Sequence, residues 1–400
     1  MNLFYRIIIS CLLKELRMFD LFSSDILFWW CIMFLVIMVS SSFNGFITPK
    51  ILLISFRKRL FDEPDKRKIH NAHIPRLGGF AFAPCILFTV ALAIGIALIF
   101  SKDELIIHLV AESRTVTFAT CAMMLIFLIG TMDDLVGVRY RNKFYIQILC
   151  AVLLILGDVW INDLHGLFGI HQLPWYLGYL LTVLVIVFIT NAINLMDGID
   201  GLASGLSGVA LIYYGVIFML DEKFIYALIS FAALGTIIPF YYYNVFGSAE
   251  HGRKIFMGDT GSLTLGLILS YLSIELNFHT PNETLVSYNY FVLAFAPLII
   301  PCFDVIRVFV HRIRCGRSPF LPDKNHLHHK LLAMGMKQRK AMISILCISA
   351  FLIIANMILS CFIQVTLLLI LNMIAWLLFI KYLNRRINKY KALNKTHSEK

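Results

Sequence analysis

Long apolar runs, separated by short polar clusters, recur along the whole 400-residue sequence. A helix that crosses a bilayer needs about 20 consecutive residues that are mostly apolar, and about eleven runs approach that length. Backbone polar groups inside a bilayer must pair within the protein, so these runs predict helices and not open sheets. We therefore predict an all-α, polytopic membrane protein. The expected spans are residues 26–47, 79–100, 116–132, 144–160, 174–191, 204–219, 223–242, 260–277, 289–309, 340–360 and 362–382.

The composition supports this class and argues against others. Hydrophobic residues make up 59% of the chain and charged residues only 15%, whereas soluble proteins have roughly 25% charged residues. No nucleic-acid-binding motif accompanies the net charge of +11, so we expect no nucleic-acid partner. The nine cysteines form no CxxC pair and most lie inside apolar runs, which predicts free thiols.

Lysine and arginine are unevenly distributed among the segments that join the spans. The segments on one side of the membrane hold most of these residues, whereas the loops on the opposite side hold only Lys102, Arg114 and Lys223. Because basic segments stay in the cytoplasm, we expect the N-terminus outside and the C-terminus inside. The expected organisation is an interfacial or disordered leader at 1–25, a transmembrane domain at 26–382 and a basic cytoplasmic tail at 383–400.

Polar side chains that can bind ligands are concentrated in the segments on the side of the membrane that is rich in Lys and Arg. Residues 74–79, with the sequence IPRLGG, place Arg76 beside a glycine pair at a helix start, where a phosphate or a lipid chain can approach the backbone. The adjacent pair Asp133 and Asp134 ends a span and is followed by Lys143. Such a group predicts a site for a divalent cation and a phosphate. The plain alternative for the segment with Arg76 is a basic linker at the lipid surface. For the aspartate pair it is a solvated helix end.

Residues 191–202, with the sequence NAINLMDGIDGL, carry amide and carboxylate groups at the next boundary on this side. Asn194, Asp197 and Asp200 recur every three residues, so one helical turn or a loose loop would aim them together. The glycines among them disfavour a continuous helix, and irregular backbone at a bilayer boundary is tolerated where it lines a cavity. The segment, which begins at Asn191, predicts a polar pocket that binds substrate.

Asp259 precedes the span at 260–277 and lies between Gly258 and Gly261. An ordinary helix N-cap is the plain interpretation, but a helix N-terminus flanked by glycines is also a ready anion site. A carboxylate at this place is well positioned to hold Mg²⁺ against a diphosphate. Asn244, which lies upstream, is expected to bind substrate as well.

The last polar group follows the span at 289–309. Arg307 closes that span, and His326, His328 and His329 lie in the long basic segment after it. A histidine cluster is one signature of zinc, but no cysteine pattern or glutamate at helical spacing accompanies this one. Phosphate recognition fits a segment rich in Arg and Lys better. A zinc-dependent hydrolase and a secondary transporter are the alternative classes, and a transporter predicts charged residues on both faces.

Taken together and in this order, these motifs resemble those of the polyprenyl-phosphate N-acetylhexosamine-1-phosphate transferases, glycosyltransferase family 4. The resemblance covers about residues 26–380. It implies an Mg²⁺-dependent enzyme of the bacterial inner membrane that moves a sugar 1-phosphate from a UDP-sugar to undecaprenyl phosphate, releases UMP and begins cell-surface polysaccharide synthesis. Residues 319–329 look like the branch that uses UDP-N-acetylglucosamine. The alternative is the phospho-N-acetylmuramoyl-pentapeptide transferase branch.

The resemblance also assigns roles to residues of this chain. Asp133 and Asp134 match the family's paired aspartates near the metal and the lipid phosphate, and Lys143 matches a lysine that contacts phosphate. Asp259 matches the ligand of Mg²⁺, for which Mn²⁺ can substitute. Membrane lipids and a second copy of the chain in a homodimer are further partners compatible with this class. The matches to the nucleotide-sugar pocket and to the histidine motif are Asn194, Asp197, Asp200, His326, His328 and His329.

Overall fold

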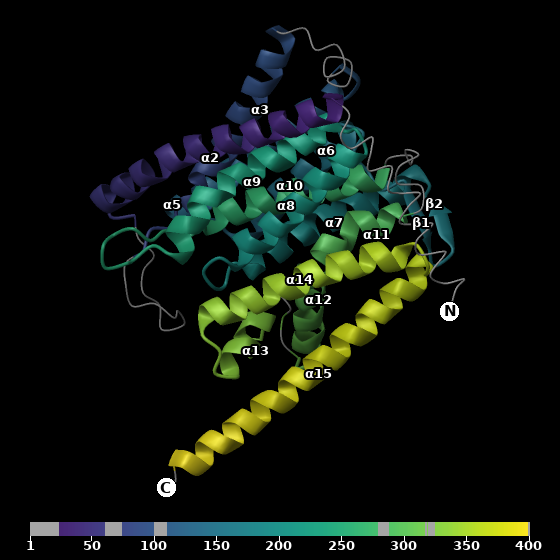
Figure 1. Ribbon diagram of the computed structural model, residues 1–400. Helices are drawn as coiled ribbons and strands as arrows, with labels where there is room; N and C mark the ends of the chain where they lie inside the picture. The colour runs from purple at the N-terminus through teal and green to yellow at the C-terminus, as the bar shows by residue number, and fades with distance from the viewer. Residues whose placement is uncertain are drawn as a thin grey trace.

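The computed structural model describes residues 24–60, 74–99, 110–278, 288–316, 318 and 325–398. These residues form a bundle of helices (Figure 1). Ten helical segments of the described chain are long and apolar enough to cross a membrane, which confirms the predicted all-α, polytopic class. In chain order the helices are α2 (Ser24–Lys58), η2 (Gly78–Ala81), α3 (Phe82–Ile99), α5 (Ser113–Val136), α6 (Tyr140–Leu156), α7 (Trp175–Met196), α8 (Leu202–Leu220), α9 (Phe224–Val245), α10 (Gly258–Phe278), α11 (Tyr290–Phe295), η3 (Ala296–Leu298), α12 (Ile299–Arg314), α13 (Leu327–Ala333), α14 (Gln338–Ser360) and α15 (Val365–Ser398).

Two of the expected spans are formed by a helix that is short or by one that is broken. Helix α6, expected at 144–160, has 17 residues, fewer than the roughly 20 of a typical span. The expected span 289–309 is divided into α11, η3 and α12. Pro297 lies at the start of η3 and has no backbone N–H to donate to the preceding turn, which favours a break there. The order of the predicted spans is kept, with a short helix and a broken one.

Helix α10 lies at the centre of the bundle, and nearly all of its side chains are buried. Helices α5, α7, α8 and α11 pack against it. Two glycines allow the closest approaches. A Cβ on Gly130 of α5 would lie 2.6 Å from Cα of Thr260, and one on Gly266 of α10 would lie 2.7 Å from Cα of Thr190 in α7. Small residues let helix backbones come this close, so α5 and α7 hold α10 firmly near its polar beginning.

A short β-hairpin, which the sequence analysis did not predict, precedes α7. Strand β1 (Asp163–Leu167) pairs antiparallel with β2 (Ile170–Gln172). Asn277, near the end of α10, donates a hydrogen bond to the carbonyl of Asp163 at 3.0 Å. The hairpin therefore covers the end of the bundle at which α10 finishes, remote from the predicted site residues.

Helix α15 is unusually long for a single span. It has 34 residues, which corresponds to roughly 51 Å at 1.5 Å per residue. The hydrocarbon core of a bilayer is only about 30 Å thick. The expected tail at 383–400 is thus helical as far as Ser398, and Figure 1 shows this helix extending beyond the rest of the bundle.

Candidate active site

The predicted polar residues meet where α5 and α7 end and where α10 begins, hereafter the site end of the bundle. Asp133 and Asp134 lie in the last turn of α5, and Asn194 lies in the last turn of α7. Asp259 lies in the first turn of α10, and Lys143 comes from the first turn of α6. The alternating course of the helices brings these distant parts of the sequence together. Their proximity is observed, and their chemical roles stay predictions.

Asp134 holds the beginning of α10. Its Oδ1 accepts a hydrogen bond from the backbone N–H of Asp259 at 2.8 Å, and its Oδ2 accepts from the N–H and the hydroxyl of Thr260 at 2.9 and 2.6 Å. The first N–H groups of a helix have no partner within the helix, and negative charge is favoured there. The anion site predicted at this helix N-terminus is therefore filled by the protein's own carboxylate.

The backbone just before Asp259 is crowded from two sides. Gly258 has a φ of +72°, a conformation that L side chains rarely adopt. A Cβ at this position would collide with the carboxylate of Asp134 and with the carbonyl of Arg76. The glycine thus lets α5 and the segment before η2 close around the start of α10, which places Arg76 at the site end.

Lys143 bridges two carboxylates at this end. Its Nζ lies 2.6 Å from Oδ2 of Asp259 and 3.1 Å from Oδ2 of Asp133. Asn194 donates from Nδ2 to Oδ1 of Asp259 at 3.2 Å and to the hydroxyl of Ser262 at 2.8 Å. The side chains of Asp133, Lys143 and Asp259 are 16%, 23% and 27% exposed. They are ordered by one another and still accessible, so a charged ligand can reach them.

Asp197 occupies the turn between α7 and α8. Helix α7 ends at Met196, and Gly201, with a φ of +76°, precedes α8, so the break predicted from the glycines is confirmed. The Asp197 side chain is exposed at the surface of this turn, although many protein atoms surround its carboxyl group. Burial and the negative charge of Asp259 and other carboxylates raise the pKa of Asp197 to about 7, although Arg76 opposes the shift.

Asn244 joins two segments of the site end. Its Oδ1 accepts a hydrogen bond from the N–H of Gly201 at 2.6 Å, and its Nδ2 donates to the carbonyl of Ile255 at 2.8 Å. Its side chain is buried. Because both ends of the amide are used inside the protein, Asn244 braces the segments before α8 and α10, and a direct contact with substrate requires these bonds to change.

Two more of the predicted substrate-binding residues also have partners within the protein. Nζ of Lys254 lies 2.5 Å from Oδ2 of Asp200, and Asn191 donates to Oε1 of Gln147 at 2.5 Å. Lys254 was missed by the sequence analysis, because no local pattern pairs it with a residue 54 positions away. Contacts of Asp200 and Asn191 with substrate stay predictions.

Asp304 organises the histidine motif, although the sequence analysis gave it no role. Its buried Oδ2 lies 2.9 Å from Nδ1 of His326, and both of its oxygens accept from the N–H of Leu327 at 3.1 and 3.2 Å. Arg307 donates to Oδ1 of Asp304 at 2.8 Å and also to the carbonyl of Asn325. A buried carboxylate needs such partners. The available signal was a carboxylate inside a predicted span, three residues before an arginine.

His328 lies against the turn between α7 and α8. A Cβ at Gly198 would fall 2.6 Å from Cε1 of His328, so the imidazole needs a glycine beneath it. Both ring nitrogens are buried and have no hydrogen-bond partner among the described residues. Burial, together with His329 and His326, lowers the pKa of His328 to about 3, so the ring is neutral at pH 7. Two unused nitrogens in a buried neutral ring are available to a ligand.

The donor set at the site end suits Mg²⁺. Asp133 and Asp259 each present a carboxylate oxygen to Lys143. Across the described ranges, no group of three or more His, Cys, Asp or Glu side chains surrounds a common point. Mg²⁺ is usually bound by one or two carboxylates together with substrate phosphates, whereas zinc takes at least three protein ligands. The arrangement can therefore hold a cation and a phosphate together.

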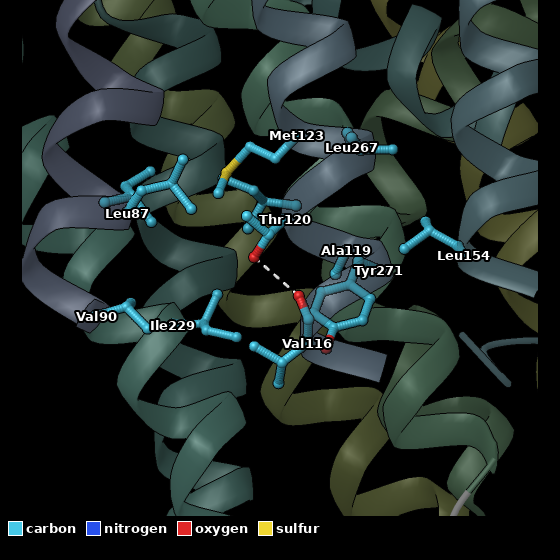
Figure 2. Close-up of a pocket in the computed structure, with 12 residues that line it drawn as sticks. Leu87, Val90, Val116, Ala119, Thr120, Met123, Leu154, Ile229, Leu267 and Tyr271 are labelled. Atoms are coloured by element: carbon cyan, nitrogen blue, oxygen red, sulfur yellow. Dashed lines mark hydrogen bonds between the residues drawn. The ribbon is translucent and has the colours of Figure 1, made fainter. Parts of the chain in front are cut away.

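A cavity elsewhere in the bundle is not part of this cluster. Figure 2 shows it among α3, α5, α6, α9 and α10, with about 470 Å³ of space, part of it open to the outside. Apolar side chains line it, the hydroxyl of Thr120 is bonded to the carbonyl of Val116, and Tyr271 contributes its ring. The lining residues of α5 lie in the half remote from Asp133, and those of α10 begin at Leu267, eight residues beyond Asp259. The cavity lacks charged groups for binding a phosphate.

Comparisons with known proteins agree with the geometry. The family model of glycosyl transferase family 4 matches residues 116–277, which carry Asp133, Asn194 and Asp259. A protein of Bacillus subtilis (strain 168) named probable undecaprenyl-phosphate N-acetylglucosaminyl 1-phosphate transferase is 33% identical over 353 residues, covering 87% of this chain and 91% of its own length.

Two relatives from Escherichia coli carry the name undecaprenyl-phosphate alpha-N-acetylglucosaminyl 1-phosphate transferase. The protein of strain O157:H7 is 29% identical over 326 residues, with 80% of this chain and 82% of its own length covered. The protein of strain K12 is 30% identical over 297 residues, with 73% and 74% covered. The likeness extends over most of each protein, and it agrees with the resemblance seen in the motifs. This chain belongs to glycosyl transferase family 4, the polyprenyl-phosphate N-acetylhexosamine-1-phosphate transferases.

Proposed function

We propose that this protein transfers N-acetylglucosamine 1-phosphate, or a related N-acetylhexosamine 1-phosphate, from a UDP-sugar to undecaprenyl phosphate and releases UMP. The product is an undecaprenyl-diphosphate-linked sugar, which begins the synthesis of a cell-surface polysaccharide. The observation that carries the proposal is the pairing of Lys143 with Asp133 and Asp259 at the start of α10, in a chain whose relatives are named for this transfer.

Electrostatics explains why this reaction needs such a cluster. A phosphate monoester carries about −1.5 to −2 charges at neutral pH, and the donor is itself a diphosphate, so the reactants repel each other. Lys143 and Arg76 supply positive charge at the site end. Enzymes of phosphoryl transfer act mostly by positioning and by electrostatic stabilisation, and both are available from groups fixed at helix ends.

Mg²⁺ is part of the proposal, with Mn²⁺ as a substitute. Asp259 and Asp133 would hold it, since Lys143 between them indicates that this position favours a cation. The bound ion would neutralise charge that develops on the phosphate oxygens. Asp259→Asn is expected to abolish turnover while the yield of folded protein stays normal. Wild-type activity in excess EDTA would contradict the metal requirement.

The residues of the chain have distinct tasks in the proposed reaction. An oxygen of the lipid phosphate attacks the β-phosphorus of the donor, and the bond to UMP breaks. UMP leaves as a phosphate, so no strong general acid is required. Asp133, held by the N–H of Val138 at 2.7 Å and by Lys143, is placed to orient the lipid phosphate or to take its last proton. The pH dependence of Asp133→Asn distinguishes these two roles, because only loss of a base removes the acid limb of the profile.

The proposed donor is UDP-N-acetylglucosamine. The proposal rests on the names of the relatives and on the resemblance of residues 319–329, of which 319–324 lie outside the described residues. The neutral ring of His328, with unused nitrogens beside Gly198, supports a contact with the donor phosphates. Product formed only from UDP-N-acetylmuramoyl-pentapeptide would move the protein to the other branch.

The reaction is proposed to occur at the cytoplasmic face of the bacterial inner membrane. The support is the excess of lysine and arginine in the segments at the site end, which the positive-inside rule places in the cytoplasm. Reporter fusions after Lys102 and after Thr280 are expected to report an outer location, and a fusion after Arg253 an inner one. The inverted pattern would contradict this orientation.

One assay tests the proposed function directly. Purified protein in detergent is incubated with undecaprenyl phosphate, Mg²⁺ and each of several UDP-N-acetylhexosamines. We expect UMP release that depends on the lipid, with a lipid product whose mass increases by one N-acetylhexosamine phosphate. Asp259→Asn is the matched inactive control. Absence of UMP with every donor would contradict the proposal and would favour the transporter class. A homodimer is compatible with the proposal, and light scattering of the same sample measures it.

A further inference from the structure

The segment of α15 beyond residue 382 packs against the short helix that carries the histidine motif. Leu383 and Ile387 are only 2% and 9% exposed, and Leu331 of α13 is 4% exposed. Leu383 and Ile387 are spaced to share one face of a helix. Asn384 and Tyr390 flank this face and are themselves exposed, and Arg385 and Lys389 are exposed on the opposite side of the helix. One face of the expected tail is therefore a packing surface.

Two specific contacts fix α13 against this surface. Nζ of Lys330, within α13, donates a hydrogen bond to Oδ1 of Asn384 at 2.7 Å. Gly335 follows α13 and has a φ of +83°. A Cβ there would lie 2.5 Å from the hydroxyl oxygen and 2.7 Å from Cζ of Tyr390, so the phenol ring lies directly on the backbone of this turn. These contacts hold the middle of α13 and the turn that follows it.

Helix α13 needs such support. It has seven residues, and helices shorter than about 12 residues are marginal without tertiary contacts. Its beginning is held by Asp304, which binds His326 and the N–H of Leu327. Beyond this start, α13 contacts α15 through Lys330, and the turn that follows it contacts α15 through Gly335. The two anchors together determine where His328 lies over Gly198.

We propose that Asn384 and Tyr390 are positioning residues for the histidine motif, with the C-terminal part of α15 acting as a strut for α13. This inference rests on the proposed function, because it assigns to α15 the alignment of His328 and His329 with the donor. The close fit of His328 on Gly198 makes the alignment sensitive. A misplacement of about 1 Å can lower turnover by roughly 100-fold without any change in the reacting groups.

The test compares variants on the two faces of one helix. Asn384→Ala and Tyr390→Ala remove the contacts. Asn384→Asp and Tyr390→Phe keep the acceptor and the ring. The controls are Arg385→Ala and Lys389→Ala, on the opposite side of the helix. We expect the first pair to lower kcat by about tenfold or more while KM changes little. The conservative pair and the controls should stay close to wild type. Should Tyr390→Ala not fold, Asn384→Ala carries the same comparison.

Hydrogen exchange gives a second measurement that does not depend on catalysis. Amide exchange in α13 should accelerate in Asn384→Ala and Tyr390→Ala, whereas exchange in α10 should not change, because the core does not depend on this contact. Wild-type kcat and wild-type exchange in both variants would overturn the proposal, as would an equal loss of kcat in Arg385→Ala. A wild-type protein that releases no UMP would overturn the proposed function instead, and exchange would still test the strut.

Discussion

The ammonium group of Lys143 lies 2.6 Å from a carboxylate oxygen of Asp259, although 116 residues separate the two in the chain. The same group lies 3.1 Å from Asp133. Two carboxylates so close to one cation would repel each other without it, and the lysine neutralises part of their charge. Lys143 thus occupies a position that also suits a divalent cation, and the proposed Mg²⁺ would compete with it for the same oxygens.

This competition predicts opposite effects of one substitution on binding and on turnover. Lys143→Gln removes the competing charge, so the protein without substrate should bind Mn²⁺ several-fold more tightly, as measured by titration with detection of free Mn²⁺ by electron paramagnetic resonance. Turnover should fall, because a cation that offsets phosphate charge is lost. Lys143→Arg is the control that keeps the charge. Unchanged or weaker Mn²⁺ binding in Lys143→Gln would contradict the competition.

The hydrogen bonds of Asp134 to the start of α10 predict a loss of stability that is separate from catalysis. Removing a helix cap costs about 0.5–2 kcal/mol, and Asp134 accepts three hydrogen bonds, so Asp134→Ala should reach the upper part of that range. Glu250→Ala is a suitable control, since Glu250 is exposed in the turn between α9 and α10, and it should change stability by less than about 0.5 kcal/mol. Thermal unfolding in detergent measures the stability of both variants. An equal loss of stability in the two would argue against the role of Asp134 as a cap.

Asp197 should make the stability of the ligand-free protein depend on pH. Its pKa is about 7 in the folded protein and about 3.9 in an unfolded chain. The folded state therefore binds more protons between these values, and stability falls as the pH rises from about 3.9 to about 7. Asp197→Asn should remove this contribution, so that the variant gains thermal stability over wild type at pH 8 and not near pH 4. A difference that does not change with pH would contradict the shifted pKa.

His328 should contribute a pH dependence of the opposite sign. Its pKa is about 3 in the folded protein and about 6.5 when unfolded. The unfolded state binds the extra proton, so stability is lost as the pH falls from about 6.5 toward about 3. In His328→Gln, the thermal stability measured in detergent should therefore change less between about pH 6.5 and about pH 3 than it does in the wild type.

His328 and His329 are also predicted to act on phosphate and not on zinc. His328→Ala and His329→Ala should each reduce turnover severely while the protein stays folded, and added zinc should restore nothing. Elemental analysis of the purified protein is the measurement. One zinc per chain that disappears in His328→Ala would show that the motif binds metal.

The residues that carry charge at the site could be recognised from the sequence, because a membrane restricts where they occur. Apolar runs of about 20 residues mark the spans, and the clusters of carboxylates, amides and basic groups between them are concentrated on one side of the membrane. Asp133, Lys143 and Asp259 were identified on this ground. The break at 197–201 was also predictable, since glycine disfavours a continuous helix whatever surrounds it.

Only the tertiary structure decided which partner each of these groups has. Asn194 and Asn244 have the same chemistry, yet Asn194 donates to Asp259 and Ser262, whereas Asn244 accepts from Gly201 and donates to Ile255. Asp304 gained its role from a histidine 22 residues away, and Tyr390 gained its role from the packing of α15 on Gly335. The sequence determines side-chain chemistry and helix length through local rules. The partner of a side chain depends on how the helices pack, and this information is spread over the whole chain.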